Sequence, residues 1–289
     1  MSYLAQAIGE LKSQIHAYLQ QSTNELVRFQ VKLDKVDLLA WLKGQSAYPQ
    51  FYLHFRDEAK ALAALGEERS FSQLNLAQEF IEESGFPLVG GLQFQGTAQF
   101  VLPKILVEQD EKGALVSFFV KDEQSANDTL AHLKTFENIT ALSALPKQIP
   151  LHTEPRANER AWCDWVNQAL VEIKSGELTK IVLANETTFH LKQAINAYDF
   201  LAESEKQNQG CYHFLWAENP HSVFVGSTPE RLFAREYNLL LTEALAGTAS
   251  VSECEEETLS QANWLLNDEK NLKENWLVVE DISQNLRNQ

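Results

Sequence analysis

The sequence predicts an α+β fold in which largely antiparallel β-sheets are covered by helices. Apolar residues recur at helical spacing near both ends of the chain and in its middle, as is typical of amphipathic helices. Between them lie short alternating segments rich in β-branched and aromatic residues, which indicate strands. Several of these segments follow one another too closely for a crossover helix, so we expect them to pair antiparallel.

The first half of the chain predicts one helix, two strands and a hairpin. The helix covers residues 2–21, where apolar side chains repeat at intervals of three and four. Residues 26–33 and 50–54 alternate between apolar and polar side chains and are expected to be strands. Residues 99–108 and 115–120 flank a polar Gln-Asp-Glu-Lys-Gly turn, which predicts a hairpin.

A linker is predicted near the middle of the chain. Residues 140–155 contain prolines and small polar residues and show no clear hydrophobic period. This divides the chain into an N-terminal α+β region, residues 1–145, which the resemblance described below implies is the variable region, and a second domain, residues 156–289.

The second domain is predicted to begin and end with helices. Apolar residues line one face from 162 to 173, and a Ser-Gly pair at 175–176 is a plausible helix stop. Residues 258–286 predict one long helix with its apolar residues in a single arc. The remaining expected elements are a short helix at 195–206 and strands at 180–189, 211–217, 222–225 and 239–242.

Charge and composition exclude several classes of function. The chain has 24 basic and 40 acidic residues, a net charge of −16, which argues against DNA or RNA as a partner because Lys and Arg carry that affinity. No segment approaches the roughly 18 apolar residues of a membrane span, and the N-terminus does not read as a signal peptide. Cys163, Cys211 and Cys254 are odd in number and widely spaced, which favours a reducing cytoplasm over a disulfide framework.

Four short motifs in the second domain carry polar residues that could do chemistry. Taken singly, each has a plain structural interpretation. Lys180 in KIVLA could be a solvated strand end, and Glu230 in GSTPERL an ordinary turn carboxylate. Glu274 in KENWLVVEDI points away from the apolar arc of its helix, as a surface residue would. In TEALAGT, residues 242–248, a strand runs into small residues that would let a ligand approach backbone amides.

Together and in this order, the four motifs resemble the chorismate-utilising enzyme family, most closely its menaquinone-type isochorismate synthases. The resemblance is specific over residues 160–289 and loose over the N-terminal half. It implies that residues 156–289 are the N-terminal portion of a chorismate-binding domain. It also implies an isomerase that converts chorismate to isochorismate with Mg²⁺ as cofactor; the oligomeric state is not predicted.

The resemblance also implies roles for individual residues. Lys180 matches the lysine that activates the attacking water as general base, and Glu230 matches the general acid that protonates the leaving C4 hydroxyl. Glu274 matches a magnesium ligand, as suits a hard cation that prefers carboxylate oxygens. The implied substrate-binding residues are Thr242, Glu243, Ala246, Gly247 and Thr248.

Two alternatives remain at this point. A salicylate synthase would keep the same base and acid, whereas Lys180 argues against an anthranilate synthase and Ala246 against an aminodeoxychorismate synthase. Members of the family continue beyond the position of Gln289 with further strands and a second magnesium ligand. The sequence therefore predicts that the C-terminal part of the fold is missing and an apolar face uncovered, and the second alternative is a non-catalytic, truncated remnant.

Overall fold

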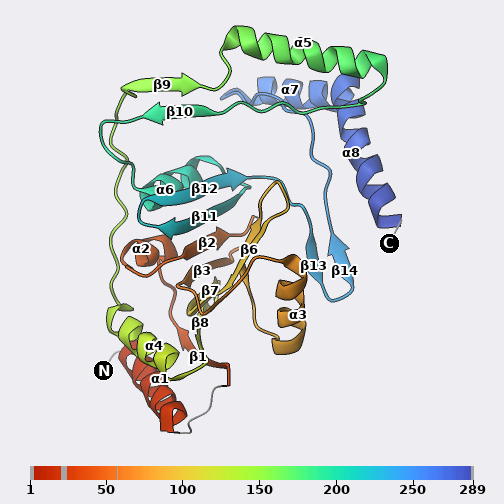
Figure 1. The fold of residues 1–289 in the computed structure, drawn as a ribbon. Coiled ribbons are helices and arrows are strands. Elements are labelled where there is room, and N and C mark those ends of the chain that lie inside the picture. The colour runs from red at the N-terminus through yellow and green to blue at the C-terminus, as the bar shows by residue number, and fades with distance from the viewer. Residues whose placement is uncertain (1–2, 21–24, 57, 288–289) are drawn as a thin grey trace. The chain divides into compact units, whose positions relative to one another are not determined.

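The structure of the protein, a computed structural model, describes residues 3–20, 25–56 and 58–287 (Figure 1). Runs of strands are interspersed with helices along the chain, and every strand pair within these residues is antiparallel. The predicted α+β class with antiparallel sheets is therefore confirmed. Within the same ranges, the structure has no helix with the length and apolar character needed to cross a membrane.

The chain forms two compact units that differ from the predicted division. Unit 1 comprises Met1–Pro146 and Ile195–Pro229, and unit 2 comprises Lys147–Ala194 and Glu230–Gln289. The first crossing, at Pro146, falls inside the predicted linker. The chain then returns to unit 1 after Ala194, because the strand that follows pairs with a strand from the N-terminal region.

Unit 1 is built on a seven-stranded sheet with the order β1-β8-β7-β3-β2-β11-β12. A second sheet has the order β4-β6-β5. The helices are α1 (Tyr3–Gln20), α2 (Leu38–Lys43), α3 (Leu74–Ser84), α4 (Glu123–Thr135) and α6 (Ala197–Gln207). The strands are β1 (Val27–Leu33), β2 (Gln50–His54), β3 (Ala61–Leu65), β4 (Arg69–Phe71), β5 (Val89–Leu92), β6 (Ala98–Leu102), β7 (Ile105–Asp110), β8 (Gly113–Val120), β11 (Tyr212–Asn219) and β12 (Ser222–Thr228).

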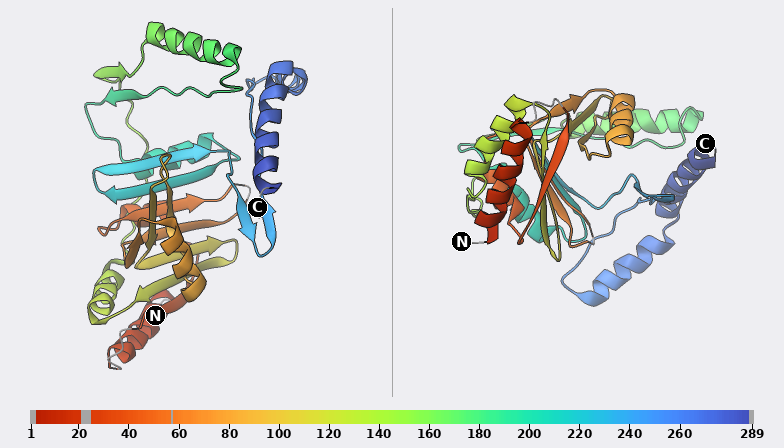
Figure 2. Two further views of the ribbon diagram at one scale, coloured as in Figure 1. Left: turned by 45° about the vertical axis from the view of Figure 1, so that its right-hand side comes forward. Right: turned by 90° about the horizontal axis from the view of Figure 1, so that it is seen from below.

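The two faces of the large sheet bury separate apolar clusters. Helices α1, α2, α4 and α6 lie on one face, and α3 with the three-stranded sheet lies on the other (Figure 2). Because side chains alternate along a strand, Ile105 and Val107 enter the helix-side cluster while Leu106 enters the other. This two-sided burial explains why the strands of unit 1 are strongly apolar.

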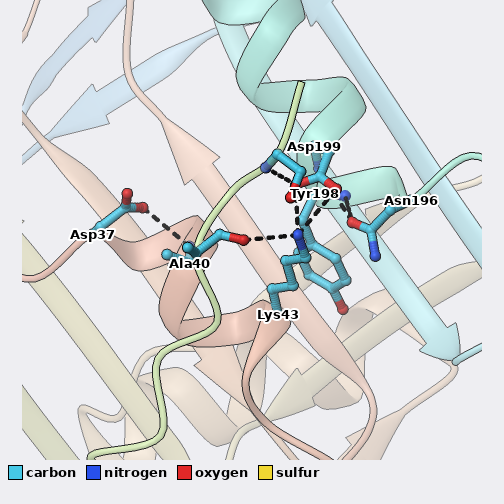
Figure 3. Close-up of polar contacts among 8 residues, drawn as sticks. Asp37, Ala40, Lys43, Asn196, Tyr198 and Asp199 are labelled. Atoms are coloured by element: carbon cyan, nitrogen blue, oxygen red, sulfur yellow. Dashed lines mark hydrogen bonds and ion pairs between the residues drawn. The ribbon is translucent and has the colours of Figure 1, made fainter. Parts of the chain in front are cut away.

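A buried ion pair fixes the start of the predicted linker to unit 1 (Figure 3). Lys43 of α2 lies with its Nζ atom 2.7 Å from Oδ1 of Asp199 on α6. The same ammonium group donates to the carbonyl of Ala141, and the Asp199 carboxylate accepts from the backbone N–H of Ser143. The segment that we expected to be a plain linker is therefore held by a polar contact at its beginning.

Unit 2 has little apolar core. Of its described residues, only Ala157 and Ala169 are buried. Its helices are α5 (Glu159–Ser175), α7 (Glu255–Asn267) and α8 (Glu269–Arg287), and its strands are β9 (His152–Pro155), β10 (Thr187–His190), β13 (Ala234–Glu236) and β14 (Leu239–Leu241). Neither α7 nor α8 buries a residue. Large apolar side chains such as Trp264 and Trp276 stay about half exposed.

Three predicted elements need correction. The strand expected at 99–108 is two strands, β6 and β7, because Pro103 lies between them and cannot donate to a sheet. The strand expected at 180–189 exists only as β10. Just before β10, the side-chain amide of Asn185 accepts from the backbone N–H of Ala157 and donates to its carbonyl, in place of backbone pairing. The long terminal helix is interrupted at Asp268, whose carboxylate accepts from the backbone N–H of Asn271 and starts α8.

Candidate active site

All the residues predicted to act in catalysis or binding lie in unit 2. Lys180 follows α5 in a non-strand segment, and Glu274 lies on α8. The Nζ atom of Lys180 is 3.3 Å from Oε1 of Glu274, and the two side chains are 25% and 32% exposed. Neither residue is therefore a simple solvated end or face, and the proposed base and the proposed metal ligand meet in one place.

The Glu230 turn is tied to the TEALAGT segment. Glu230 itself is exposed. The backbone N–H of the next residue, Arg231, donates to Oε1 of Glu243 at 3.0 Å. The hydroxyl of Thr242 donates to the carbonyl of Leu232 at 2.9 Å. Thr242 and Glu243 thus hold the turn that carries Glu230, so their observed contacts are those of positioning residues.

The rest of the TEALAGT segment lies against α8. The side chain of Asn275 donates to the carbonyl of Ala244 at 2.9 Å. Gly247 has a φ of +84°, and a Cβ atom there would lie 3.0 Å from Oδ1 of Asn271. Ala246 is half-buried, whereas Gly247 and Thr248 are exposed. The backbone around Gly247 is therefore both close to α8 and open to solvent.

Sequence reasoning missed two residues of this arrangement, Asn271 and Asn275. They are one helical turn apart on α8 and flank Glu274 in sequence, so they lie on neighbouring parts of one face. Asn271 is itself fixed, because its side-chain amide donates to Oδ2 of Asp268 at 2.8 Å. The i, i+4 spacing of two asparagines around the glutamate was the signal that could have revealed them.

Among the residues predicted to bind metal, Glu274 supplies one carboxylate that could hold Mg²⁺. The structure contains no group of three or more His, Cys, Asp or Glu side chains arranged to hold a metal within its described ranges. Mg²⁺ is commonly held by one or two carboxylates, with substrate and water completing its octahedron. Glu274 offers one partly exposed carboxylate, and the position beside its Oε1 already attracts a cation, the ammonium of Lys180. Glu274 therefore fits the role of a single protein ligand.

The clearest displaced pKa values belong to unit 1 and not to this site. The Tyr52 hydroxyl donates to Oε1 of Glu205 at 2.9 Å, and burial raises the pKa of Tyr52 far above its usual value. The carboxylate of Glu205, with its Oε1 atom 3.7 Å from Nδ1 of His54, raises the pKa of His54. Burial lowers the pKa of His213, whose ring lies 5.8 Å from that of His54. The cluster touches one of the four motifs, because Nδ1 of His213 lies within hydrogen-bond distance, 2.7 Å, of the hydroxyl of Ser227 in GSTPERL.

Comparison with known proteins points to one family. A family model described as "Chorismate binding enzyme" matches residues 92–289. Isochorismate synthase MenF of Haemophilus influenzae is 95% identical over the whole chain, and the chain spans 67% of that relative. The corresponding enzyme of Pasteurella multocida is 46% identical over 99% of the chain and 67% of its own length.

A solved structure agrees with these matches. The structure of MenF, the menaquinone-specific isochorismate synthase from Escherichia coli, superposes with a TM-score of 0.88 at 29% sequence identity. The match covers 97% of this chain and 69% of that one. The similarity therefore extends through both compact units and is not confined to the motif-bearing part.

Proposed function

This chain belongs to the chorismate-binding enzyme family, and from that premise we propose that it acts as a magnesium-dependent isochorismate synthase in menaquinone biosynthesis. Its substrate is chorismate, and the reaction moves the hydroxyl group from C4 to C2 of the ring. The observation that carries the proposal is the 3.3 Å approach between Lys180 and Glu274. It brings the proposed proton acceptor to the proposed metal ligand.

Two side chains of this chain would move the protons. Lys180 accepts a proton from the attacking water, whose oxygen bonds to C2 while both ring double bonds shift and the C4–O bond breaks. Glu230 gives a proton to the oxygen that leaves C4, which departs as water. One water is consumed and one released, so the reaction balances as an isomerisation. A positioned acid and base of this kind contribute about 10²–10⁴-fold each to such a reaction.

The remaining residues of the site would hold these groups and the substrate. Thr242 and Glu243 keep the Glu230 turn in place through the contacts described above. The exposed backbone at Gly247 and Thr248 leaves amide groups accessible to a substrate carboxylate, and the small side chain of Ala246 beside them leaves room for that approach. Mg²⁺, when bound by Glu274, would supply positive charge for a carboxylate of the dianionic substrate.

A salicylate synthase is the alternative activity, because it would use the same base and acid. The similarity to several isochorismate synthases favours the isomerase. A non-catalytic remnant is the alternative from a different class, and the exposed apolar side chains of α7 and α8 are the observation that favours it. We place the reaction in the reducing cytoplasm, in keeping with the three free cysteines Cys163, Cys211 and Cys254.

Product analysis separates these possibilities. Purified protein is incubated with chorismate in the presence of Mg²⁺ or of excess chelator, and the products are resolved by liquid chromatography. We expect isochorismate with Mg²⁺ and none with chelator. Undiminished turnover in chelator would refute the metal requirement, and salicylate with pyruvate would identify the alternative enzyme. Absence of turnover together with absence of a chorismate-induced rise in melting temperature would favour the remnant.

A further inference from the structure

We propose that Lys180 and Mg²⁺ exclude each other at the carboxylate of Glu274, so that metal binding releases Lys180 from its partner. The inference rests on the proposed function, which gives Lys180 the role of base and Glu274 the role of ligand. The inference adds a sequence of events. Mg²⁺ first replaces the ammonium of Lys180 at the Glu274 carboxylate, and only then is Lys180 free to approach the substrate.

The distances make simultaneous occupation unfavourable. The ammonium nitrogen of Lys180 lies 3.3 Å from Oε1 of Glu274. Mg²⁺ binds oxygen at about 2.0–2.1 Å, so a metal on that atom would lie within about 5.4 Å of an unmoved Nζ atom. Two positive charges, one of them divalent, repel strongly at this separation when they are partly shielded from water. Either the metal binds weakly or the lysine moves away.

The lysine is the partner that can move. Its ammonium ends a flexible four-carbon chain, so rotations of the side chain can carry it away from the carboxylate. Glu274 lies on α8, and the next residue of that helix, Asn275, donates a hydrogen bond to the carbonyl of Ala244. At one-quarter exposure, the Lys180 side chain also has access to solvent. The carboxylate thus stays in place while its cation is exchanged.

Titration of the full chain with Mg²⁺ by calorimetry tests this directly, without any measurement of turnover. The variant Lys180→Met keeps the length of the stem and removes the charge. Its matched control is Lys273→Met, because Lys273 is an exposed lysine adjacent to Glu274 in sequence. Lys180→Arg keeps a cation and guards against a mere packing effect. Glu274→Gln and the double variant Lys180→Met/Glu274→Gln complete a double-mutant cycle.

We expect Lys180→Met to bind Mg²⁺ about fivefold more tightly than the parent, since a partly exposed ion pair has a strength of this order. Lys273→Met should change the affinity less than twofold, and Lys180→Arg should bind no more tightly than the parent. Glu274→Gln should weaken binding, and the effect of Lys180→Met should vanish in that background. Circular dichroism of each variant establishes that it is folded.

The possible failures are distinguishable. Unchanged Mg²⁺ affinity in Lys180→Met, with weaker binding in Glu274→Gln, would overturn the exclusion and leave the proposed function standing. Unchanged affinity in Glu274→Gln would remove the glutamate from the metal site and overturn both. Absence of Mg²⁺ binding by every variant would do the same. Equal tightening in Lys180→Met and Lys273→Met would reduce the effect to overall charge and overturn the exclusion.

Discussion

Removal of the Lys43 ammonium should destabilise unit 1 strongly. Its Nζ atom lies 2.7 Å and 3.0 Å from the two carboxylate oxygens of Asp199 and 2.9 Å from the carbonyl of Ala141 (Figure 3). The side chains of Lys43 and Asp199 are only 11% and 9% exposed. The variant Lys43→Met would therefore leave a carboxylate almost out of water without its cation.

The expected loss follows from what Asp199 retains. Breaking a buried ion pair by removing one partner costs about 3–5 kcal/mol. Asp199 keeps the hydrogen bond from the backbone N–H of Ser143, and its place in the first turn of α6 is favourable for a negative charge. Both contacts reduce the penalty, so we expect the low end of the range, about 3 kcal/mol in the free energy of unfolding of unit 1.

Urea unfolding followed by circular dichroism measures this loss, and amide hydrogen exchange in α2 assigns it to unit 1. The control is Lys206→Met, which removes the same charge from an exposed pair with Glu203 and should leave the midpoint unchanged. Lys43→Met/Asp199→Asn should recover part of the stability, since it also removes the unpaired charge. A loss below about 1 kcal/mol in Lys43→Met, well under the range for a broken buried pair, would refute the reasoning.

Three further predictions concern the site and the polar cluster of unit 1. Lys180→Ala and Glu230→Gln should each lower kcat by about 10²–10⁴-fold with little change in KM, because each acts on a proton in the transition state; a Lys180→Ala variant that keeps more than about a tenth of parental kcat would exclude this role. Gly247→Ala should lower the melting temperature and raise the KM for chorismate, because a φ of +84° strains other residues by about 1–2 kcal/mol; an unchanged melting temperature and KM would contradict this. Glu205→Gln should destabilise more at pH 5.5 than at pH 8, because the nearby carboxylate of Glu205 raises the pKa of His54. Stabilisation from a raised histidine pKa is complete below the unfolded pKa of about 6.5 and is lost as pH rises through the folded value. Equal losses at the two pH values would show that this histidine does not contribute.

Local signals predicted the elements whose boundaries are set by neighbouring residues. The turn after β7 leads into Gly113, the first residue of β8. Strands β7 and β8 pair on either side of this turn, as the hairpin pattern predicts. Helix α5 begins after Asn158, whose side chain accepts from the N–H of Ala161, and ends at Gly176 with a φ of +85°. Gly113 and Gly176 were visible in the sequence, so the hydrophobic period and these glycines were enough to predict the hairpin and the end of α5. The cap at Asn158 was not predicted.

Contacts between residues far apart in the sequence could not be predicted from these local patterns. The return of residues 195–229 to unit 1 depends on β11 pairing with β2, which lies more than 150 residues earlier. In the KIVLA segment, the apolar sequence resembles a strand, yet the exposed Val182 shows that no sheet buries it. The four motifs predicted which residues belong to the site, but the contact between Lys180 and Glu274 joins residues almost 100 positions apart. Only the fold could show that they form an ion pair.

The site residues of α8 are held by polar contacts and not by burial. This helix buries no residue, and the side chain of Asn275 donates from its Glu274 turn to the carbonyl of Ala244. A hydrogen bond in such a setting contributes about 0.5–1.5 kcal/mol, so α8 should open at a small fraction of the free energy needed to unfold unit 1. A ligand that contacts both Glu274 and the Gly247 backbone would bind only the closed arrangement and would stabilise it in proportion to its affinity. The weakness of the helix and the location of the site on it are therefore linked, because the proposed metal ligand Glu274 contacts Lys180 and its neighbour Asn275 contacts Ala244 through polar groups alone.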